Sequence, residues 1–341
     1  MEPLLIAVLI IGFFVTFLVM PMWIRKAKYI GLIWPDMNKY GFPRTVVGSG
    51  GLVVIAGFFL SVLIFVGLLT FYYKSEQYLV SIFALLSCIL MLSFIGVVDN
   101  LMGWGGGLRR SGLRRRYRVI LCLFAAIPLM AINAGDHIMI LPFIGAINFG
   151  LFYTLVLIPI AIAGAATTFN FLAGFNGLEA GQGILILTAL SIVAFFTGSS
   201  WLAVIGMCMV ASLVAFWIFN KVPAKVFPGD SLTYAVGGLI AVMAILGNME
   251  KLAILFFIPY ILEVILKSRG KLEKQSWGKP NSDGSLEMPY NKIYGVEHLA
   301  IWIIKKFKEK VYEKDVVRLI NGIELAIILI SFWIFRENIF R

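Results

Sequence analysis

The chain has 341 residues, of which 60% are hydrophobic and only 14% are charged, and its mean hydropathy is +0.94. Soluble domains carry about a quarter charged residues, so this composition excludes a soluble enzyme, a disordered chain and a disulfide-rich secreted scaffold. The net charge of +11 favours basic cytoplasmic loops over nucleic-acid binding, because such loops collect Lys and Arg in membrane proteins. The sequence therefore predicts a multi-pass integral membrane protein.

Ten apolar runs approach the length that a membrane helix needs. They cover residues 3–24, 49–72, 78–98, 117–133, 148–170, 182–198, 200–219, 232–248, 251–267 and 319–338. We expect an all-α fold with about ten transmembrane helices that form one polytopic domain over residues 1–341. The first run has no small-residue cleavage site, so we expect it to remain as a helix.

The distribution of basic residues predicts the orientation in the membrane. If the N-terminus lies outside, loops 25–48, 99–118, 171–181, 220–231 and 267–318 face the cytoplasm. These loops hold 5, 6, 0, 2 and 12 Lys and Arg residues, which is 25 of the 29 in the chain. This asymmetry is typical of cytoplasmic loops. Within the long basic loop 268–318, the stretch Ile301–Val316 predicts an amphipathic helix on an anionic membrane surface.

Polar residues gather at the expected cytoplasmic ends of the helices. The four clusters are Asp36, Asn38 and Lys39; Asp99 and Asn100; Asn170, Asn176 and Glu179; and Gly229-Asp230. A transporter would instead place ionisable residues near the bilayer midplane. Carboxylates and amides beside basic loops favour a divalent cation such as Mg²⁺ and a phosphate-bearing substrate at the cytoplasmic face.

Each cluster also has a purely structural interpretation. Asp230 can cap the helix that follows it, and Asn170 and Asn176 can be helix-end and turn residues. Asp99 can simply lie at the end of its helix. The glycine-rich pieces at 48–51 and 103–107 lack the Lys-Ser/Thr of a phosphate-binding loop, so we expect helix-packing or loop glycines there.

The run Asn170–Gln182, with the sequence NFLAGFNGLEAGQ, closely resembles the signature of the polyprenyl-phosphate N-acetylhexosamine-1-phosphate transferases. It is most similar to the eukaryotic and archaeal branch, the UDP-GlcNAc–dolichyl-phosphate GlcNAc-1-phosphotransferases. Three further matches follow in the order that the family shows. They are Asp36–Lys39, Lys225–Asp230 and Leu286–Tyr290. The similarity therefore extends from the first loop to residue 290.

The resemblance implies transfer of GlcNAc-1-phosphate from UDP-GlcNAc to dolichyl or another polyprenyl phosphate, with release of UMP. This is the first step of lipid-linked oligosaccharide assembly for N-glycosylation. The implied cofactor is Mg²⁺, with Mn²⁺ as a substitute. The implied partners are the two substrates and membrane lipids, without nucleic acid. The membrane is a cell membrane of archaeal type or the endoplasmic reticulum, and the oligomeric state, with a homodimer as one option, stays open.

The resemblance also implies roles for individual residues. It assigns metal binding to Asn170 and Asp230, catalysis to Asp99 and Lys39, and substrate binding to Asp36, Asn38, Asn176, Glu179, Phe227 and Arg118. Asn176 and Phe227 would contact the uracil, and Asp99 would orient or deprotonate the acceptor phosphate. In-line attack by a phosphate oxygen needs positioning and charge neutralisation more than covalent chemistry.

The chain departs from the family pattern at three places. Asn100 stands where the family commonly has a second aspartate, and Arg118 stands for a lysine. The long loop lacks the family's Arg/His cluster, which leaves Arg269, Lys274 and Lys279 as candidates for contacts with the donor phosphates. The identity of the donor sugar therefore stays open, and another UDP-N-acetylhexosamine such as UDP-GalNAc is the alternative donor.

Two other protein classes are less consistent with the sequence. A membrane transporter would show midplane charges and internal repeats, which are not found. A CDP-alcohol phosphotransferase would show several aspartates on neighbouring helices, and that cluster is not found either. We therefore expect a Mg²⁺-dependent sugar-1-phosphate transferase.

Overall fold

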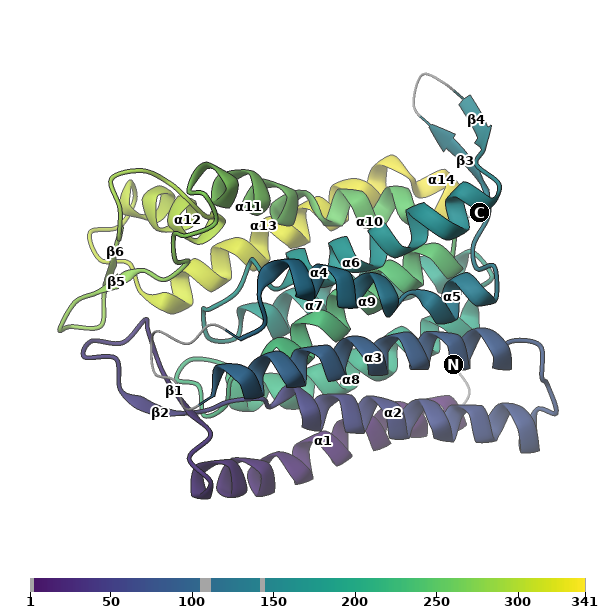
Figure 1. Cartoon of the computed structure of the whole chain (residues 1–341), viewed down its shortest axis with the longest axis horizontal. Coiled ribbons are helices and arrows are strands. Elements are labelled where there is room, and N and C mark those ends of the chain that lie inside the picture. Colours follow the sequence, from purple (N-terminus) through teal and green to yellow (C-terminus); the bar gives the residue numbers. More distant parts are fainter. Residues whose placement is uncertain (1–2, 105–111, 142–144, 341) are drawn as a thin grey trace.

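The computed structural model describes residues 3–104, 112–141 and 145–340, and most of them lie in helices that run side by side (Figure 1). Among these residues, six helices are long and apolar enough to cross a membrane. They are α1 (Pro3–Tyr29), α2 (Gly51–Gly67) with its π-helical continuation η1 (Leu68–Tyr72), α3 (Leu79–Gly103), α7 (Leu178–Phe196), α8 (Ser200–Asn220) and α13 (Glu313–Ile334). These six helices confirm the prediction of a mostly helical membrane protein.

The other four apolar runs form shorter or broken helices. They are α4 (Arg115–Phe124) with α5 (Ile127–Ala131), η3 (Tyr153–Leu157) with α6 (Ile158–Phe169), α9 (Asp230–Leu246), and α10 (Glu250–Phe256) with α11 (Ile258–Arg269). Two of the breaks come just before Pro128 and Pro259, because proline has no backbone N–H and clashes with the preceding turn.

Three antiparallel two-stranded ribbons interrupt the helical pattern, which the all-α prediction did not include. They pair β1 (Ile33–Pro35) with β2 (Arg44–Val47), β3 (Ile138–Leu141) with β4 (Gly145–Asn148), and β5 (Lys279–Pro280) with β6 (Leu286–Glu287). The β1–β2 and β5–β6 ribbons lie at one end of the helices (Figure 1). The β3–β4 hairpin and α14 (Arg336–Ile339) lie at the other end.

The long loop 268–318 is folded differently from the prediction. The stretch Ile301–Val316 is not one helix, since α12 covers Val296–Lys305 and α13 begins at Glu313. A capping box, in which the Asp315 carboxylate accepts from the Tyr312 backbone N–H at 3.2 Å, starts the new helix. Helix α12 is amphipathic, but its Ile301 side is buried in the protein.

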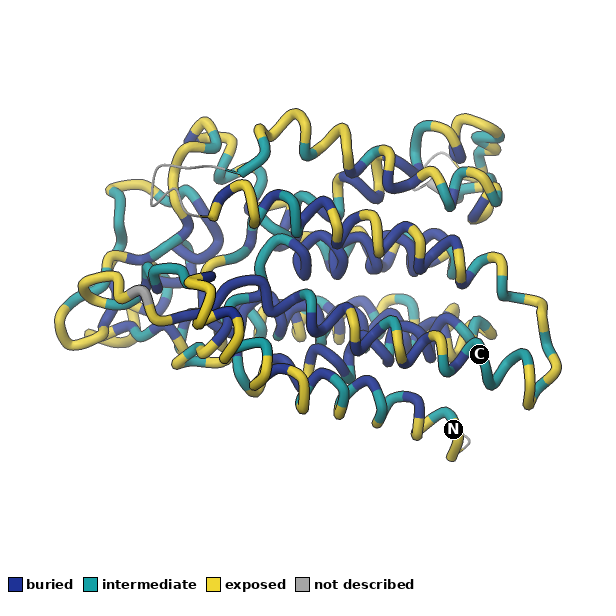
Figure 2. Tube along the Cα trace, turned by 60° about the horizontal axis from the view of Figure 1, so that its bottom comes forward, coloured by how far each residue is buried: buried dark blue, intermediate teal, exposed yellow. Residues whose placement is uncertain are grey.

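Residues on the outer faces of the helices are exposed, while those on the inner faces are buried (Figure 2). Many of the exposed residues are large and apolar. Leu18, Phe94 and Ile265 are each more than 60% exposed. Soluble proteins rarely leave such broad apolar faces uncovered. These faces are consistent with helices that are surrounded by lipid.

Candidate functional site

The folding brings all five basic-side loops to one cavity of about 770 Å³. Eight of the thirteen residues singled out in the sequence line it, namely Asp36, Asp99, Arg118, Asn170, Asn176, Glu179, Phe227 and Asp230. The other five, Asn38, Lys39, Arg269, Lys274 and Lys279, are not among its lining residues. The cavity therefore collects side chains from the first loop through to the long loop.

Close packing of α3 against the start of α9 places two aspartates together. A Cβ on Gly96 would lie 2.4 Å from the Asp230 carbonyl oxygen, so only glycine fits this contact. Asp99 lies three residues further along α3, and its carboxylate interacts with that of Asp230. Gly229, with φ of +71°, provides the left-handed backbone that leads into α9.

Asp99 is buried and is held by three donors. The Leu113 backbone N–H lies 2.7 Å from Oδ1, while Arg118 Nη1 at 3.2 Å and the Tyr234 hydroxyl at 3.0 Å donate to Oδ2. Sequence reasoning missed Tyr234. Its position four residues after Asp230 on one helix face was the available signal. The three donors fix the direction in which the Asp99 carboxylate faces the cavity.

Asn170 and Asp230 provide oxygen atoms at neighbouring positions. The Thr233 hydroxyl donates to Asn170 Oδ1 at 3.0 Å and approaches the Asp230 carbonyl at 3.3 Å. The Asp230 carboxylate interacts with the side chains of both Asn170 and Asp99. Within the described ranges, no group of three or more His, Cys, Asp or Glu side chains could hold a metal by itself. Two carboxylates and one amide oxygen nevertheless fit Mg²⁺, which keeps waters and binds substrate phosphates.

Asn100 connects three helices at the cavity wall. Its Oδ1 accepts from the Asp230 backbone N–H at 3.2 Å, and its Nδ2 donates to Ser49 Oγ at 3.3 Å. Asn100 therefore caps α9 and ties the end of α3 to the start of α2. This contact gives a structural role to the position where the family commonly has a second aspartate.

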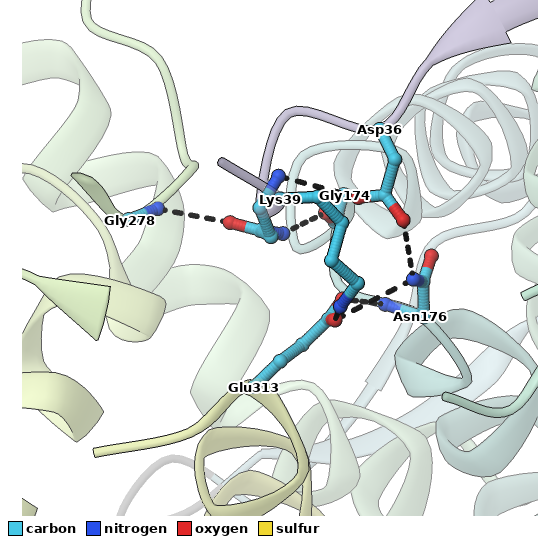
Figure 3. Close-up of polar contacts among 7 residues, drawn as sticks. Asp36, Lys39, Gly174, Asn176, Gly278 and Glu313 are labelled. Atoms are coloured by element: carbon cyan, nitrogen blue, oxygen red, sulfur yellow. Dashed lines mark hydrogen bonds and ion pairs between the residues drawn. The ribbon is translucent and has the colours of Figure 1, made fainter. Parts of the chain in front are cut away.

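A second polar network joins the first loop to α13 (Figure 3). Asn176 donates through Nδ2 to Asp36 Oδ2 at 3.0 Å, and its backbone N–H donates to Glu313 Oε1 at 2.8 Å. The Lys39 ammonium forms an ion pair with Glu313. Lys39 was expected to be catalytic, but its charge is directed to a buried carboxylate outside the cavity lining.

Asn38 joins three loops and is almost completely buried. Its Nδ2 donates to the Gly174 carbonyl at 2.7 Å, and its Oδ1 accepts from the Gly278 backbone N–H at 3.1 Å. Glu179 supports the same turn, because its Oε1 accepts from the Gly174 N–H at 2.9 Å. Asn38 thus does not line the cavity but fixes the position of Gly174, which does.

The long loop lines the cavity with residues that differ from those expected. Arg269 lies over the Tyr294 ring, with 5.5 Å between the guanidinium carbon and the ring centroid, and Lys274 lies 5.0 Å above Tyr290. The side chains that line the cavity are those of Lys267, Gln275, Ser276 and Trp277. Sequence reasoning missed all four. The i,i+4 spacing of Glu263 and Lys267 at the end of an apolar run was the signal for the lysine.

Several known proteins are similar to this chain. Residues 82–248 match the model of "Glycosyl transferase family 4". A protein of Saccharolobus solfataricus is 34% identical over 95% of this chain and 94% of its own length, and it is provisionally named UDP-N-acetylglucosamine–dolichyl-phosphate N-acetylglucosaminephosphotransferase. The Dictyostelium discoideum protein of that name is 28% identical over 73% of this chain and 68% of its own length.

A more distant relative carries a different name. The phospho-N-acetylmuramoyl-pentapeptide-transferase of Halalkalibacterium halodurans is 28% identical over 80% of this chain and 86% of its own length. The matched region includes most of α3 and all of α6, α7 and α9. These helices hold or adjoin the four site residues Asp99, Asn170, Asn176 and Asp230. The chain belongs to the glycosyl transferase family 4 proteins, together with these sugar-phosphate transferases.

Proposed function

We propose that the chain transfers GlcNAc-1-phosphate from UDP-GlcNAc to dolichyl or another polyprenyl phosphate and releases UMP. The observation that carries this proposal is the convergence of Asp99, Asp230, Asn170 and Arg118 on one cavity. Carboxylate and amide oxygens can hold a divalent cation, and the guanidinium can bind a phosphate. The names of the relatives support the same substrates.

The side chains suit an in-line displacement between two phosphates. Asn170 and Asp230 would hold Mg²⁺, which when bound supplies positive charge to the phosphate oxygens. Asp99, fixed by Arg118 and Tyr234, would orient the acceptor phosphate. A phosphate monoester is largely ionised near neutral pH. Orientation of the attacking oxygen therefore matters more than removal of a proton.

The proposed topology has ten membrane-spanning helices, with the N-terminus outside and the cavity at the cytoplasmic face. The end of the structure that holds the cavity also holds the described parts of the loops in which Lys and Arg gather, which supports this orientation. Exposed apolar faces of the helices would accommodate the polyprenyl chain. The reaction would start lipid-linked oligosaccharide assembly in a cell membrane or the endoplasmic reticulum.

The test is transfer of a radiolabelled sugar. The purified chain in detergent is incubated with dolichyl phosphate, Mg²⁺ and UDP-GlcNAc labelled in the sugar, beside an EDTA control and a UDP-GalNAc arm. Label in the lipid phase, release of UMP and loss of both with EDTA are expected. Label only from UDP-GalNAc would change the donor. No lipid label from either donor with folded protein would overturn the transferase proposal.

The metal assignment has its own variants. Asp230→Ala and Asn170→Ala are expected to abolish Mg²⁺-dependent turnover while the thermal unfolding midpoint stays close to that of the unchanged chain. Asp136→Ala is the matched control, because Asp136 is exposed and its partner is the nearby Ile138 N–H. Full activity in either cavity variant would remove the metal role from that residue.

A further inference from the structure

The cavity has two basic side chains among its described lining residues, Arg118 and Lys267. Arg118 is already engaged by Asp99 and Tyr234. The loop cations that the sequence suggested for donor contacts lie elsewhere, over tyrosine rings or on an exposed strand. Lys267 is therefore the second cation that a phosphate in this cavity can meet.

Lys267 is held at the cavity wall by its surroundings. It lies in the last turn of α11, and its side chain is only 13% exposed. The ammonium donates to the Phe171 carbonyl and forms an ion pair with Glu263 Oε1 at 3.2 Å. Phe171 directly follows Asn170, and its ring lies 5.4 Å from the ammonium. The positive charge thus lies beside the loop that begins with the proposed metal ligand.

A pair of buried carboxyl groups lies behind Lys267. Glu263 and Glu297 are both fully buried, and Glu263 Oε2 accepts from the Val296 N–H at 2.5 Å. A Cβ on Gly295 would lie 2.8 Å from Glu297 Oε2 and 3.2 Å from Glu263 Oε1, so the two carboxyls meet around this glycine. Neither oxygen of Glu297 has a hydrogen-bond donor among the described residues.

The two carboxyl groups lie together behind the lysine. Burial and the neighbouring Glu263 raise the pKa of Glu297 well above its ordinary value, so Glu297 holds a proton more readily than a free carboxyl group does. Glu263 forms the ion pair with Lys267, and Glu297 lies beside Glu263 at Gly295. Glu263 therefore positions the lysine, and Glu297 positions Glu263.

Resting on the proposed function, we propose that Lys267 binds the diphosphate of the nucleotide-sugar donor, with Glu263 and Glu297 as its positioning residues. Lys267 contacts Phe171, in the loop that leads to Asn176, the residue expected to contact the uracil. Arg118 instead contacts Asp99, the proposed acceptor-side residue. Lys267 is therefore assigned to the donor and Arg118 to the acceptor.

The chemistry explains why a cation is useful there. An oxygen of the acceptor phosphate forms a bond to the sugar-linked phosphorus, and the bond from that phosphorus to the bridging oxygen breaks. The electron pair of the broken bond goes to the bridging oxygen, which leaves as part of UMP. Lys267 can stabilise the charge that develops on this leaving phosphate.

The experiment measures binding and transfer by the full chain in detergent. The probes are uridine, UMP and UDP, each titrated by calorimetry, together with initial rates over a range of donor and acceptor concentrations. The variants are Lys267→Met and Lys267→Arg, with Lys271→Met as the matched control because Lys271 is exposed and outside the cavity lining. Wild-type binding and transfer are measured first and test the proposed function itself.

Lys267→Met is expected to weaken UDP binding by about tenfold or more, to leave uridine binding unchanged, and to lower kcat/KM for the donor without raising the acceptor KM. Lys267→Arg should recover part of the UDP affinity, and Lys271→Met should match the wild type. Equal weakening of uridine and UDP, or unchanged UDP affinity in an active protein, would overturn the role of Lys267. An inactive wild type would instead count against the proposed function.

Discussion

Asn176 donates its side-chain amide to Asp36 across 3.0 Å, although the two residues lie 140 positions apart in the chain. Asp36→Ala removes this acceptor and leaves the buried Asn176 amide with its longer contact to Glu313 Oε2 at 3.5 Å. We expect the KM for the nucleotide-sugar donor to rise about tenfold, since a lost hydrogen bond to a charged group costs roughly 1.5–3 kcal/mol. Steady-state kinetics at saturating acceptor would measure this rise.

Glu273→Ala is the control for that experiment, because Glu273 is an exposed carboxylate of the long loop outside the cavity lining. It should leave the donor KM unchanged. An Asp36→Ala protein with the wild-type donor KM would show that the Asp36–Asn176 contact does not position the donor.

Thr233→Val tests the support of Asn170. The hydroxyl that donates to Asn170 Oδ1 at 3.0 Å is lost while the shape of the side chain is kept. Loss of such a supporting group typically lowers metal affinity or activity by about 10–100-fold. We expect the Mg²⁺ concentration for half-maximal rate to rise within that range, with recovery at higher Mg²⁺. Thr197→Val, at an exposed helix end, should change nothing, and an unchanged Mg²⁺ requirement in Thr233→Val would contradict the prediction.

Asn100 allows a comparison of two substitutions. Asn100→Asp keeps an oxygen that can accept from the Asp230 N–H, so we expect transfer activity within about threefold of the wild type. Asn100→Leu removes the acceptor and should destabilise the protein by roughly 1 kcal/mol, the usual loss for a helix cap. Thermal unfolding and initial rates distinguish the two. Equal behaviour of both variants would argue against a capping role.

The raised pKa of Glu297 predicts that the stability of the protein depends on pH. The folded chain holds the Glu297 proton at a raised pKa, whereas the unfolded chain releases it above the ordinary value of about 4.5. The folded state therefore binds more protons, and its free energy of unfolding falls as pH rises, by up to about 1.4 kcal/mol per pH unit. Glu263 and Lys267 are the charged groups that face Glu297. Burial lowers the pKa of the adjacent His298.

Glu297→Gln keeps this position neutral at every pH. The unfolding midpoint of the variant relative to the wild type should therefore increase as the pH rises above the ordinary carboxyl pKa of about 4.5. Glu309→Gln is the control, because Glu309 is exposed. Its unfolding midpoint should change with pH in the same way as that of the wild type. A constant difference between Glu297→Gln and the wild type would show that Glu297 is ionised in the folded protein.

The sequence was sufficient to predict the helical elements because membrane helices are long and their apolar character persists over many residues. It did not predict the breaks at Pro128 and Pro259 or the three ribbons. Their strands have only two to four residues, which is too short for a period-two pattern to stand out. The boundary between α12 and α13 was missed because it depends on the Asp315 cap.

For the site, motif resemblance selected residues that the fold does bring to one cavity, including Asp99 and Asp230. It could not show how their partners are arranged. Lys39 forms an ion pair with Glu313, which lies 274 residues further along the chain. Lys267 lies at the end of an apolar run, where a single positive charge is typical of the end of a membrane helix. Such assignments depend on contacts between distant segments, which local spacing does not contain.

Glu313 has a consequence for the order of biosynthesis. The carboxylate that receives the Asn176 backbone N–H and the Lys39 ammonium is the first residue of α13, the last of the long helices. Ribosomes add residues from the N-terminus, so the loops at 36–39 and 174–176 are made long before their shared partner. A nascent chain that stops short of residue 313 holds most of the polar residues of the cavity but lacks the carboxylate that fixes Asn176 and Lys39, so this part of the site is completed late in synthesis.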